Sequence, residues 1–229
     1  MFLEAVIVCV DFGDFLSTTL PINRREFSRT IVVTSPEDEL TEKVSVENGA
    51  TLLLTTRYRE NGTFNKGKAI NDGLALCKKR GWVVLLDADI SFPRHFHRRL
   101  SINLKREPMQ GQTLYGLHRL MCPSYQEWLH YLRHRTHVWR LDKRRGPRKK
   151  PAGYFQLWNA REMPNVRYPE NYPDKPDAFG GYHGDLAFAR SFPRCRHLEA
   201  PYLIHLDAKG NGGASDYAGR TSPRWGDTG

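Results

Sequence analysis

The sequence predicts an α/β fold, a single domain with a mainly parallel central sheet flanked by helices. Over the first 90 residues, short apolar runs alternate with helical patterns. This alternation is typical of parallel strands joined by right-handed helical crossovers. With 229 residues and 39% hydrophobic residues, the chain is large enough for one sizeable core. No apolar run is long enough to span a membrane, so we expect no membrane span.

The first half is expected to contain strands at 5–10, 29–35, 50–56 and 82–89. Helices are expected at 14–27, with an interruption near Pro21, and at 36–49 and 65–81. In the 36–49 segment, Pro36 suits a first helical position, acidic residues fill the first turn, and Gly49 suits the end. The opening MFLEAVIVCV contains Glu4 and no basic leader, which indicates a first strand and not a signal peptide.

The second half is less regular. We expect a helix after Pro93, a strand at 113–122, an amphipathic helix at 124–140, a basic loop at 141–153 and a strand at 154–159. A helix start near residue 182 and a last strand at 199–207 follow. The Gly-rich tail, 208–229, is expected to be flexible.

Charge is unevenly distributed along this basic chain, whose formal net charge is +10. Residues 1–63 are net acidic, whereas residues 94–150 carry a large excess of Lys and Arg. A clustered excess of this kind favours an anionic partner over a merely solvated surface. The four cysteines are scattered without a CxxC pair, which indicates reduced thiols and a cytoplasmic location.

Asp87 and Asp89 end the buried strand WVVLLDAD. Residues two apart on a strand point the same way, so these carboxylates could hold Mg²⁺ or Mn²⁺ and, through it, a diphosphate. The alternative is a polar strand end in which one aspartate caps the next turn. A phosphatase of the haloacid dehalogenase type also uses DxD, but normally on its first strand.

Other motifs follow in order. In FNKGKAIN, 64–71, a helix start offers backbone donors and lysines to a phosphate. In FGGYHGD, 179–185, paired glycines allow close approach of a ligand. Asp185 could cap a helix or take a proton from a hydroxyl. His205, in YLIHLD, is either structural or a third ligand to the metal.

The order of these motifs resembles that of the GT-A-fold glycosyltransferases, especially the inverting, family-2-like enzymes. The resemblance covers about 3–207 and implies one GT-A domain at 1–207, with a nucleotide-binding half at 1–90 and an acceptor-binding half at 91–207. It implies a nucleotide-sugar donor, for which UDP-glucose is the family-weighted choice, and Mn²⁺ or Mg²⁺.

The resemblance also assigns roles to residues. Asp185 would be the catalytic base, although Gly184 stands where the family has a glutamate. The metal ligands would be Asp87, Asp89 and His205, and Asp87 could instead reach the ribose. The nucleotide and donor sugar would contact Val10, Asp11, Thr34, Ser35, Asp38, Lys68, Asn71, Asp87, Gly180 and Gly181.

The acceptor is inferred from charge. Arg144, Arg145, Arg148, Lys149 and Lys150 could neutralise phosphates of double-stranded DNA, and neighbouring aromatic residues could stack a flipped base. The chain resembles small phage-type DNA glycosyltransferases and base J glucosyltransferase, which act on hydroxymethylated bases. A phage-encoded enzyme would then work in the host cytoplasm. The alternatives are a surface-saccharide or lipid-linked acceptor and, in a different class, a non-catalytic basic DNA-binding protein.

Overall fold

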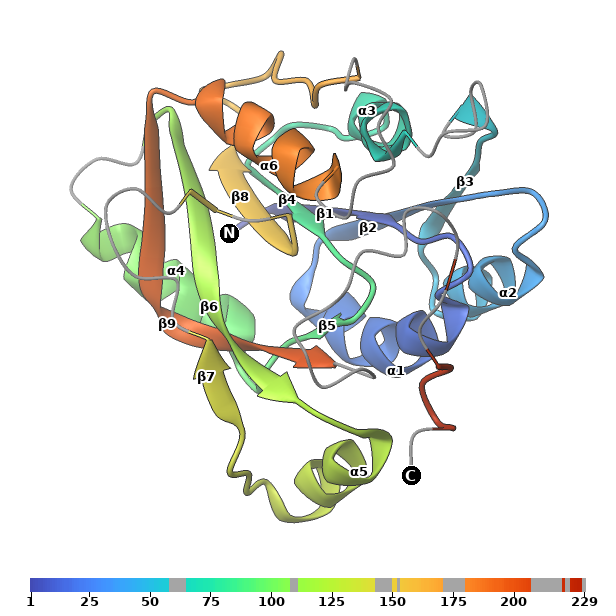
Figure 1. Cartoon of the computed structure of the whole chain (residues 1–229). Helices are drawn as coiled ribbons and strands as arrows, with labels where there is room; N and C mark the ends of the chain where they lie inside the picture. Colours follow the sequence, from blue (N-terminus) through green and yellow to red (C-terminus); the bar gives the residue numbers. More distant parts are fainter. Residues whose placement is uncertain are drawn as a thin grey trace.

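The computed structural model describes residues 1–57, 65–107, 111–142, 150–151, 153–170, 180–206, 220 and 223–227, with the backbone alone at 180–183. In these parts of the chain, one sheet has the strand order β3-β2-β1-β4-β8-β6-β9-β5, and β7 pairs with β6 at the side (Figure 1). Helices cover both faces of the sheet, so the predicted α/β class is confirmed.

The first half of the sheet is parallel. β1 (Leu3–Val8) lies between β2 (Arg29–Thr34) and β4 (Trp82–Leu86), and β3 (Thr51–Leu54) pairs with β2. The carboxyl ends of these strands therefore meet at one edge, where ligands bind in open α/β sheets.

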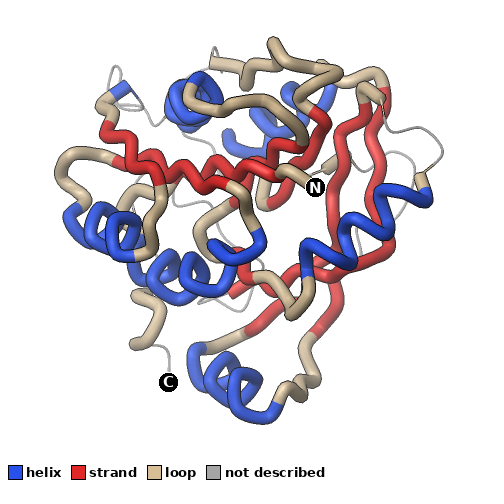
Figure 2. Tube along the Cα trace, turned by 180° about the vertical axis from the view of Figure 1, so that it is seen from behind, coloured by secondary structure: helices blue, strands red, loops and turns tan. Residues whose placement is uncertain are grey.

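The second half makes the sheet mixed, where the sequence predicted a mainly parallel one. β8 (Phe155–Asn159) runs antiparallel to β4 and to β6 (Thr113–Cys122). β9 (Arg194–Leu206) runs parallel to β6, and the two lie side by side as the longest strands in Figure 2. The short β5 (Ile90–Ser91) pairs antiparallel with β9, which sets Ile90 opposite His205.

Two helical layers bury alternate side chains of β1. Leu3, Ala5 and Ile7 pack in the core cluster that includes α1 (Gly13–Asn23), α2 (Glu39–Glu47) and α4 (Phe96–Arg106). Val6 points to the other face, into the cluster with α3 (Lys66–Ala75) and α6 (Gly180–Arg190). Because both faces of β1 are covered, the strand is a nearly continuous apolar run in sequence, which is the signal that predicts it.

A third, smaller cluster lies beside α5 (Tyr125–His134) and β7 (Arg140–Asp142). Its buried members include Trp128 and Trp139, and also Trp225 from the C-terminal segment, which is 5% exposed. Trp225 of the tail expected at 208–229 is thus buried, and 208–219, 221, 222, 228 and 229 lie outside the described residues.

Several predicted boundaries are corrected by local chemistry. α2 begins at Glu39 and not at Pro36, because the Asp38 side chain caps it by accepting a hydrogen bond from the Thr41 N–H.

α1 passes through Pro21 and ends at Asn23, followed by a 3₁₀ turn, η1 (Arg24–Glu26). α5 ends at His134, because Arg135 adopts a left-handed φ of 60°. α3 ends at Ala75, short of the predicted residue 81.

No helix in the described part of the chain is long and apolar enough to cross a membrane.

Candidate active site

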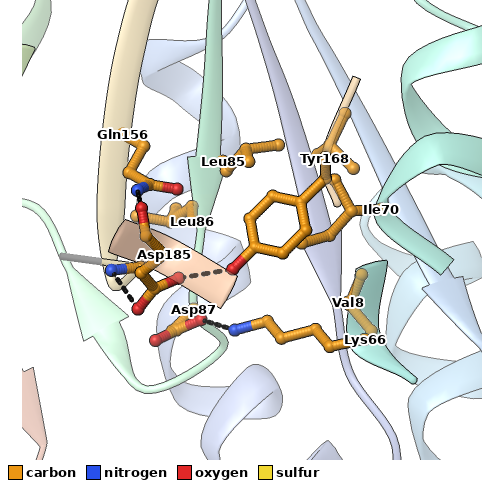
Figure 3. Close-up of a pocket in the computed structure, with 11 residues that line it drawn as sticks. Val8, Lys66, Ile70, Leu85, Leu86, Asp87, Gln156, Tyr168 and Asp185 are labelled. Atoms are coloured by element: carbon orange, nitrogen blue, oxygen red, sulfur yellow. Dashed lines mark hydrogen bonds and ion pairs between the residues drawn. The ribbon is translucent and has the colours of Figure 1, made fainter. Parts of the chain in front are cut away.

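A small pocket opens at the carboxyl edge of the parallel strands, between the ends of β1 and β4, the start of β8, the N-terminal half of α3 and the middle of α6 (Figure 3). Its floor is apolar and its rim carries charged and polar groups. The lining residues are Val6, Val8, Lys66, Ile70, Leu85, Leu86, Asp87, Gly153, Gln156, Tyr168 and Asp185.

Asp185 lies at the centre of this pocket and uses both carboxylate oxygens. Its Oδ1 accepts a hydrogen bond from the Tyr168 hydroxyl at 2.7 Å, and its Oδ2 accepts one from the Gly153 N–H, also at 2.7 Å. Figure 3 shows the Tyr168 hydroxyl directed at the Asp185 carboxylate, with the hydrogen bond drawn as a dashed line. A carboxylate held in this way has a fixed orientation and still keeps lone pairs for a proton.

Two glycines leave the space for this arrangement. A Cβ on Gly153 would overlap the Asp185 carboxylate, and a Cβ on Gly184 would lie 2.9 Å from the Tyr168 hydroxyl. The family glutamate expected at position 184 therefore has no room here, because the ring of Tyr168 occupies that place. The Gly184 departure seen in the sequence thus has a steric cause.

Tyr168 is itself tightly positioned. Its backbone N–H donates to the side-chain oxygen of Asn71, and its carbonyl accepts from the Asn71 amide, each at 2.8 Å. Its ring stacks on Phe188, with centroids 5.1 Å apart. The sequence predicted that Asn71 contacts the nucleotide. In the structure its side-chain amide is bonded to Tyr168 and Glu170, so it anchors the tyrosine of the pocket.

Burial raises the pKa of Asp185 from its usual 3.8 to about 6. The Lys66 cation and the hydrogen bond from Tyr168 limit this rise, whereas the negative charge of Asp87 adds to it. A carboxyl group with a pKa near 6 is a better proton acceptor at neutral pH than an ordinary aspartate.

Lys66 also lines this pocket, although the sequence pattern assigned no contact to it. Its Nζ lies 2.6 Å from Asp87 Oδ1, and the pair is only partly exposed. The signal was present in FNKGKAIN, where two lysines flank a glycine, but the predicted contact was assigned to Lys68. At Lys68 the backbone N–H is bound by the capping side chain of Asn65.

Asp89 and His205 meet where β5 pairs with β9. His205 Nε2 lies 3.0 Å from Asp89 Oδ2, and His205 is 4% exposed. Burial alone would raise the pKa of Asp89, but the charges of His205, Arg119 and Lys66 and the His205 hydrogen bond outweigh burial and lower it. The predicted proximity of these two residues across 116 positions is therefore present.

The metal trio is only partly assembled, because Asp87 points to Lys66 and not to Asp89 and His205. Among the described residues, no three His, Cys, Asp or Glu side chains form a cluster that could hold a metal ion. Asp89 Oδ1 and His205 Nδ1 are nevertheless buried and have no hydrogen-bond partner within the described chain. An imidazole beside a carboxylate with a spare oxygen is a donor set suited to Mn²⁺ or Mg²⁺.

The loops predicted to hold the nucleoside lie beside each other at the same edge. The Asp11 N–H donates to Asp38 Oδ2 at 2.7 Å, and the Thr34 hydroxyl donates to the same oxygen at 3.2 Å. Ser35 is 2% exposed, and its hydroxyl donates to the Glu37 carboxylate at 2.7 Å. Val10 is half-buried at the start of the Asp11 turn.

The other predicted site residues are the two glycines of α6 and the basic residues between 144 and 150. Gly180 and Gly181 open α6. Lys150 is half-buried, and Arg144, Arg145, Arg148 and Lys149 lie outside the described residues.

No protein-family model matches the sequence, and no curated protein matches it either. Solved structures do resemble it. Glucosyl-3-phosphoglycerate synthase from Mycobacterium tuberculosis, in complex with Mg²⁺ and UDP, is 14% identical, with 89% of this chain and 71% of that chain covered and a TM-score of 0.52. The complex of the same enzyme with Mn²⁺, UDP-glucose and phosphoglyceric acid is 15% identical, with 89% and 71% covered and a TM-score of 0.52.

Another mycobacterial protein is 17% identical, with 89% of this chain and 67% of that chain covered and a TM-score of 0.55. The chain spans only 41% of mannosyl-3-phosphoglycerate synthase from Rubrobacter xylanophilus. At such identities the likeness concerns the fold. The chain has the GT-A fold of these glycosyltransferases, as the order of its motifs predicted.

Proposed function

We propose that the protein is a glycosyltransferase that moves a sugar from a nucleotide-sugar donor to a hydroxyl acceptor with inversion. The observation that supports this proposal is the oriented Asp185 carboxylate at the ligand-binding edge of a GT-A fold, and its pKa of about 6 suits a proton acceptor. The structurally similar glucosyl-3-phosphoglycerate synthase binds UDP and UDP-glucose, which supports the same donor class here.

In this reaction Asp185 accepts the proton of the acceptor hydroxyl as the hydroxyl oxygen attacks the anomeric carbon. The bond between that carbon and the nucleoside diphosphate breaks on the opposite face, so the configuration inverts. Tyr168 and Gly153 keep the carboxylate oriented while its charge changes. Lys66, now paired with Asp87, places a cation where it can attract the departing diphosphate.

Asp89 and His205 would hold Mn²⁺ or Mg²⁺, and Asp87 would join them or contact the ribose. The ion, when bound, neutralises charge on the diphosphate. The enzymes of similar fold bind UDP with Mg²⁺ or Mn²⁺, which supports this ion and UDP-glucose as the first donor to test.

The direct test is Asp185→Asn. The variant should bind UDP-glucose as the wild type does but lose transfer, since the donor contacts are unchanged and only the proton acceptor is removed. Binding is measured by calorimetry and transfer by mass spectrometry of the product. If donor affinity falls together with the rate, Asp185 is a donor-site residue and the assignment of the base is wrong.

For the acceptor, we propose a hydroxymethylated base in double-stranded DNA. In the described part of residues 94–142, each carboxylate has a partner: Glu107 with Arg196, Glu127 with Trp139, and Asp142 with Arg119. The cations of this region are mostly exposed: Arg94, Arg98, Arg99, Lys105, Arg106, Arg133, Arg135 and Arg140. This surface favours a polyanion, and its charge is the argument for DNA.

A salt titration of DNA binding tests the acceptor. Replacement of Arg144, Arg145, Lys149 and Lys150 by Ala should flatten the salt dependence by about 0.9 per lost phosphate contact. Mass spectrometry of nucleosides from hydroxymethylated DNA, incubated with Mn²⁺ and nucleotide sugars, then identifies the product. Parallel slopes, or a wild type that binds no DNA at low salt, would favour a saccharide or lipid-linked acceptor.

A further inference from the structure

The described part of the C-terminal segment, residues 220 and 223–227, contacts the turn between β1 and α1. Arg220 has a 7% exposed side chain and forms a two-pronged ion pair with Asp14, in the first turn of α1, at 2.6 and 2.8 Å. Its Nη1 also donates to the carbonyl of Asp11 at 2.6 Å. A planar guanidinium is the side chain suited to this pattern of simultaneous contacts.

Aromatic rings complete the attachment. The Arg220 guanidinium lies over the Phe12 ring, 4.7 Å from its centroid, and Trp225 stacks on Phe15 at 5.2 Å. The Trp225 N–H donates to the same Asp14 carboxylate. These contacts exclude water from the ion pair, which makes it stronger than an exposed one.

The turn that Arg220 contacts is a strained one. Asp11 has a φ of 60°, in the left-handed region that non-glycine residues rarely adopt. Such a conformation persists when its surroundings fix it from several sides. Here the Asp11 N–H is bound by Asp38 and its carbonyl by Arg220, so both polar backbone groups of the strained residue are held.

We propose that Arg220 is a positioning residue that holds the Val10–Asp11 turn in the conformation that receives the nucleoside of the donor. The donor role rests on the proposed function, whereas the contact with the turn does not. The C-terminal segment is thereby part of the donor site although it lies more than 200 positions from the turn in sequence.

The segment offers a matched control. Arg224 has a 57% exposed side chain and lies 3.9 Å from the Asp11 carboxylate, a surface pair of little expected strength. Arg224→Ala and Arg220→Met each remove one positive charge from the same segment. Arg220→Lys keeps the charge but loses the planar fork, so it separates charge from geometry.

Two measurements test the proposal. Hydrogen exchange of the amides at 9–16, measured without any ligand, should be faster in Arg220→Met than in the wild type and unchanged in Arg224→Ala. The KM for UDP-glucose should rise about tenfold in Arg220→Met, as expected for a lost charged hydrogen bond, with kcat nearly unchanged. Arg220→Lys should lie between the wild type and Arg220→Met in both measurements.

The outcomes are distinguishable. Equal exchange in Arg220→Met and the wild type would overturn the hold on the turn. Faster exchange with an unchanged KM would overturn the positioning role. If the wild type binds neither UDP nor UDP-glucose while the exchange difference persists, the proposed function fails, and the donor role of Arg220 fails with it.

Discussion

Asp185→Asn should stabilise the protein at neutral pH while it abolishes transfer. Burial penalises the charged carboxylate of Asp185, and an asparagine of nearly the same shape avoids that penalty. The hydrogen bonds survive the change, because the Asn oxygen accepts from the Gly153 N–H and its amide donates to the Tyr168 hydroxyl, which rotates.

The size of the effect follows from the pKa. The pKa of Asp185 rises from 3.8 to about 6 on folding. At about 1.4 kcal/mol per pH unit, the ionised carboxylate costs the native state about 3 kcal/mol. Because the pKa of Asp185 is higher in the folded state, this cost is absent below about pH 4. It grows as the pH rises toward 6 and is fully present above that value.

Urea unfolding of both proteins at several pH values measures the difference. The free energy of unfolding of Asp185→Asn, minus that of the wild type, should grow by about 2–3 kcal/mol between pH 4 and 7.5. Glu47→Gln removes an exposed carboxylate on α2 and is the control for loss of one negative charge. A difference that stays flat over this pH range would refute the raised pKa and remove the main support for Asp185 as base.

Three further outcomes are expected. Gly153→Ala should lower kcat about 100-fold, because its Cβ would displace the Asp185 carboxylate, and kinetics at saturating substrates would detect this. Lys66→Met should shift the acidic limb of the kcat/KM profile to higher pH, because the Lys66 cation lowers the pKa of Asp185; an unmoved limb would contradict this. Asp89→Asn should raise the Mn²⁺ concentration needed for activity about 10–100-fold, and full wild-type activity in excess EDTA would exclude the metal.

The first half of the fold could be predicted from the sequence because its strands are buried on both faces. Ile31, Val32 and Val33 form an apolar run that needs no knowledge of its neighbours. The first part of β9 lacks this signal. Arg194, Arg196 and Glu199 are exposed there, so the strand resembles a polar loop in sequence and was predicted to begin at residue 199.

Candidate site residues could be predicted only where a motif itself contains a carboxylate or a histidine. Asp185, Asp89 and His205 could be proposed because a carboxylate or histidine beside an apolar strand or a Gly-rich motif is informative in itself, and their roles stay predictions. Tyr168 was not predicted, because it lies in a Pro-rich stretch. Its position depends on hydrogen bonds to Asn71, which is nearly 100 residues away in the sequence. The attachment of Arg220 is likewise tertiary, and a Gly-rich tail gives no local signal for it.

The paired carboxylates of the DAD motif are compensated separately. Lys66 forms an ion pair with Asp87, and His205 lies within hydrogen-bond distance of Asp89. Asp185 accepts hydrogen bonds from neutral donors, the Tyr168 hydroxyl and the Gly153 N–H. Since Lys66 also affects the pKa of Asp185, any anion that draws Lys66 away from the pocket would raise that pKa and strengthen Asp185 as a proton acceptor. In the proposed function, a diphosphate bound by Lys66 would in this way make the Asp185 carboxylate more basic before it accepts the proton of the hydroxyl.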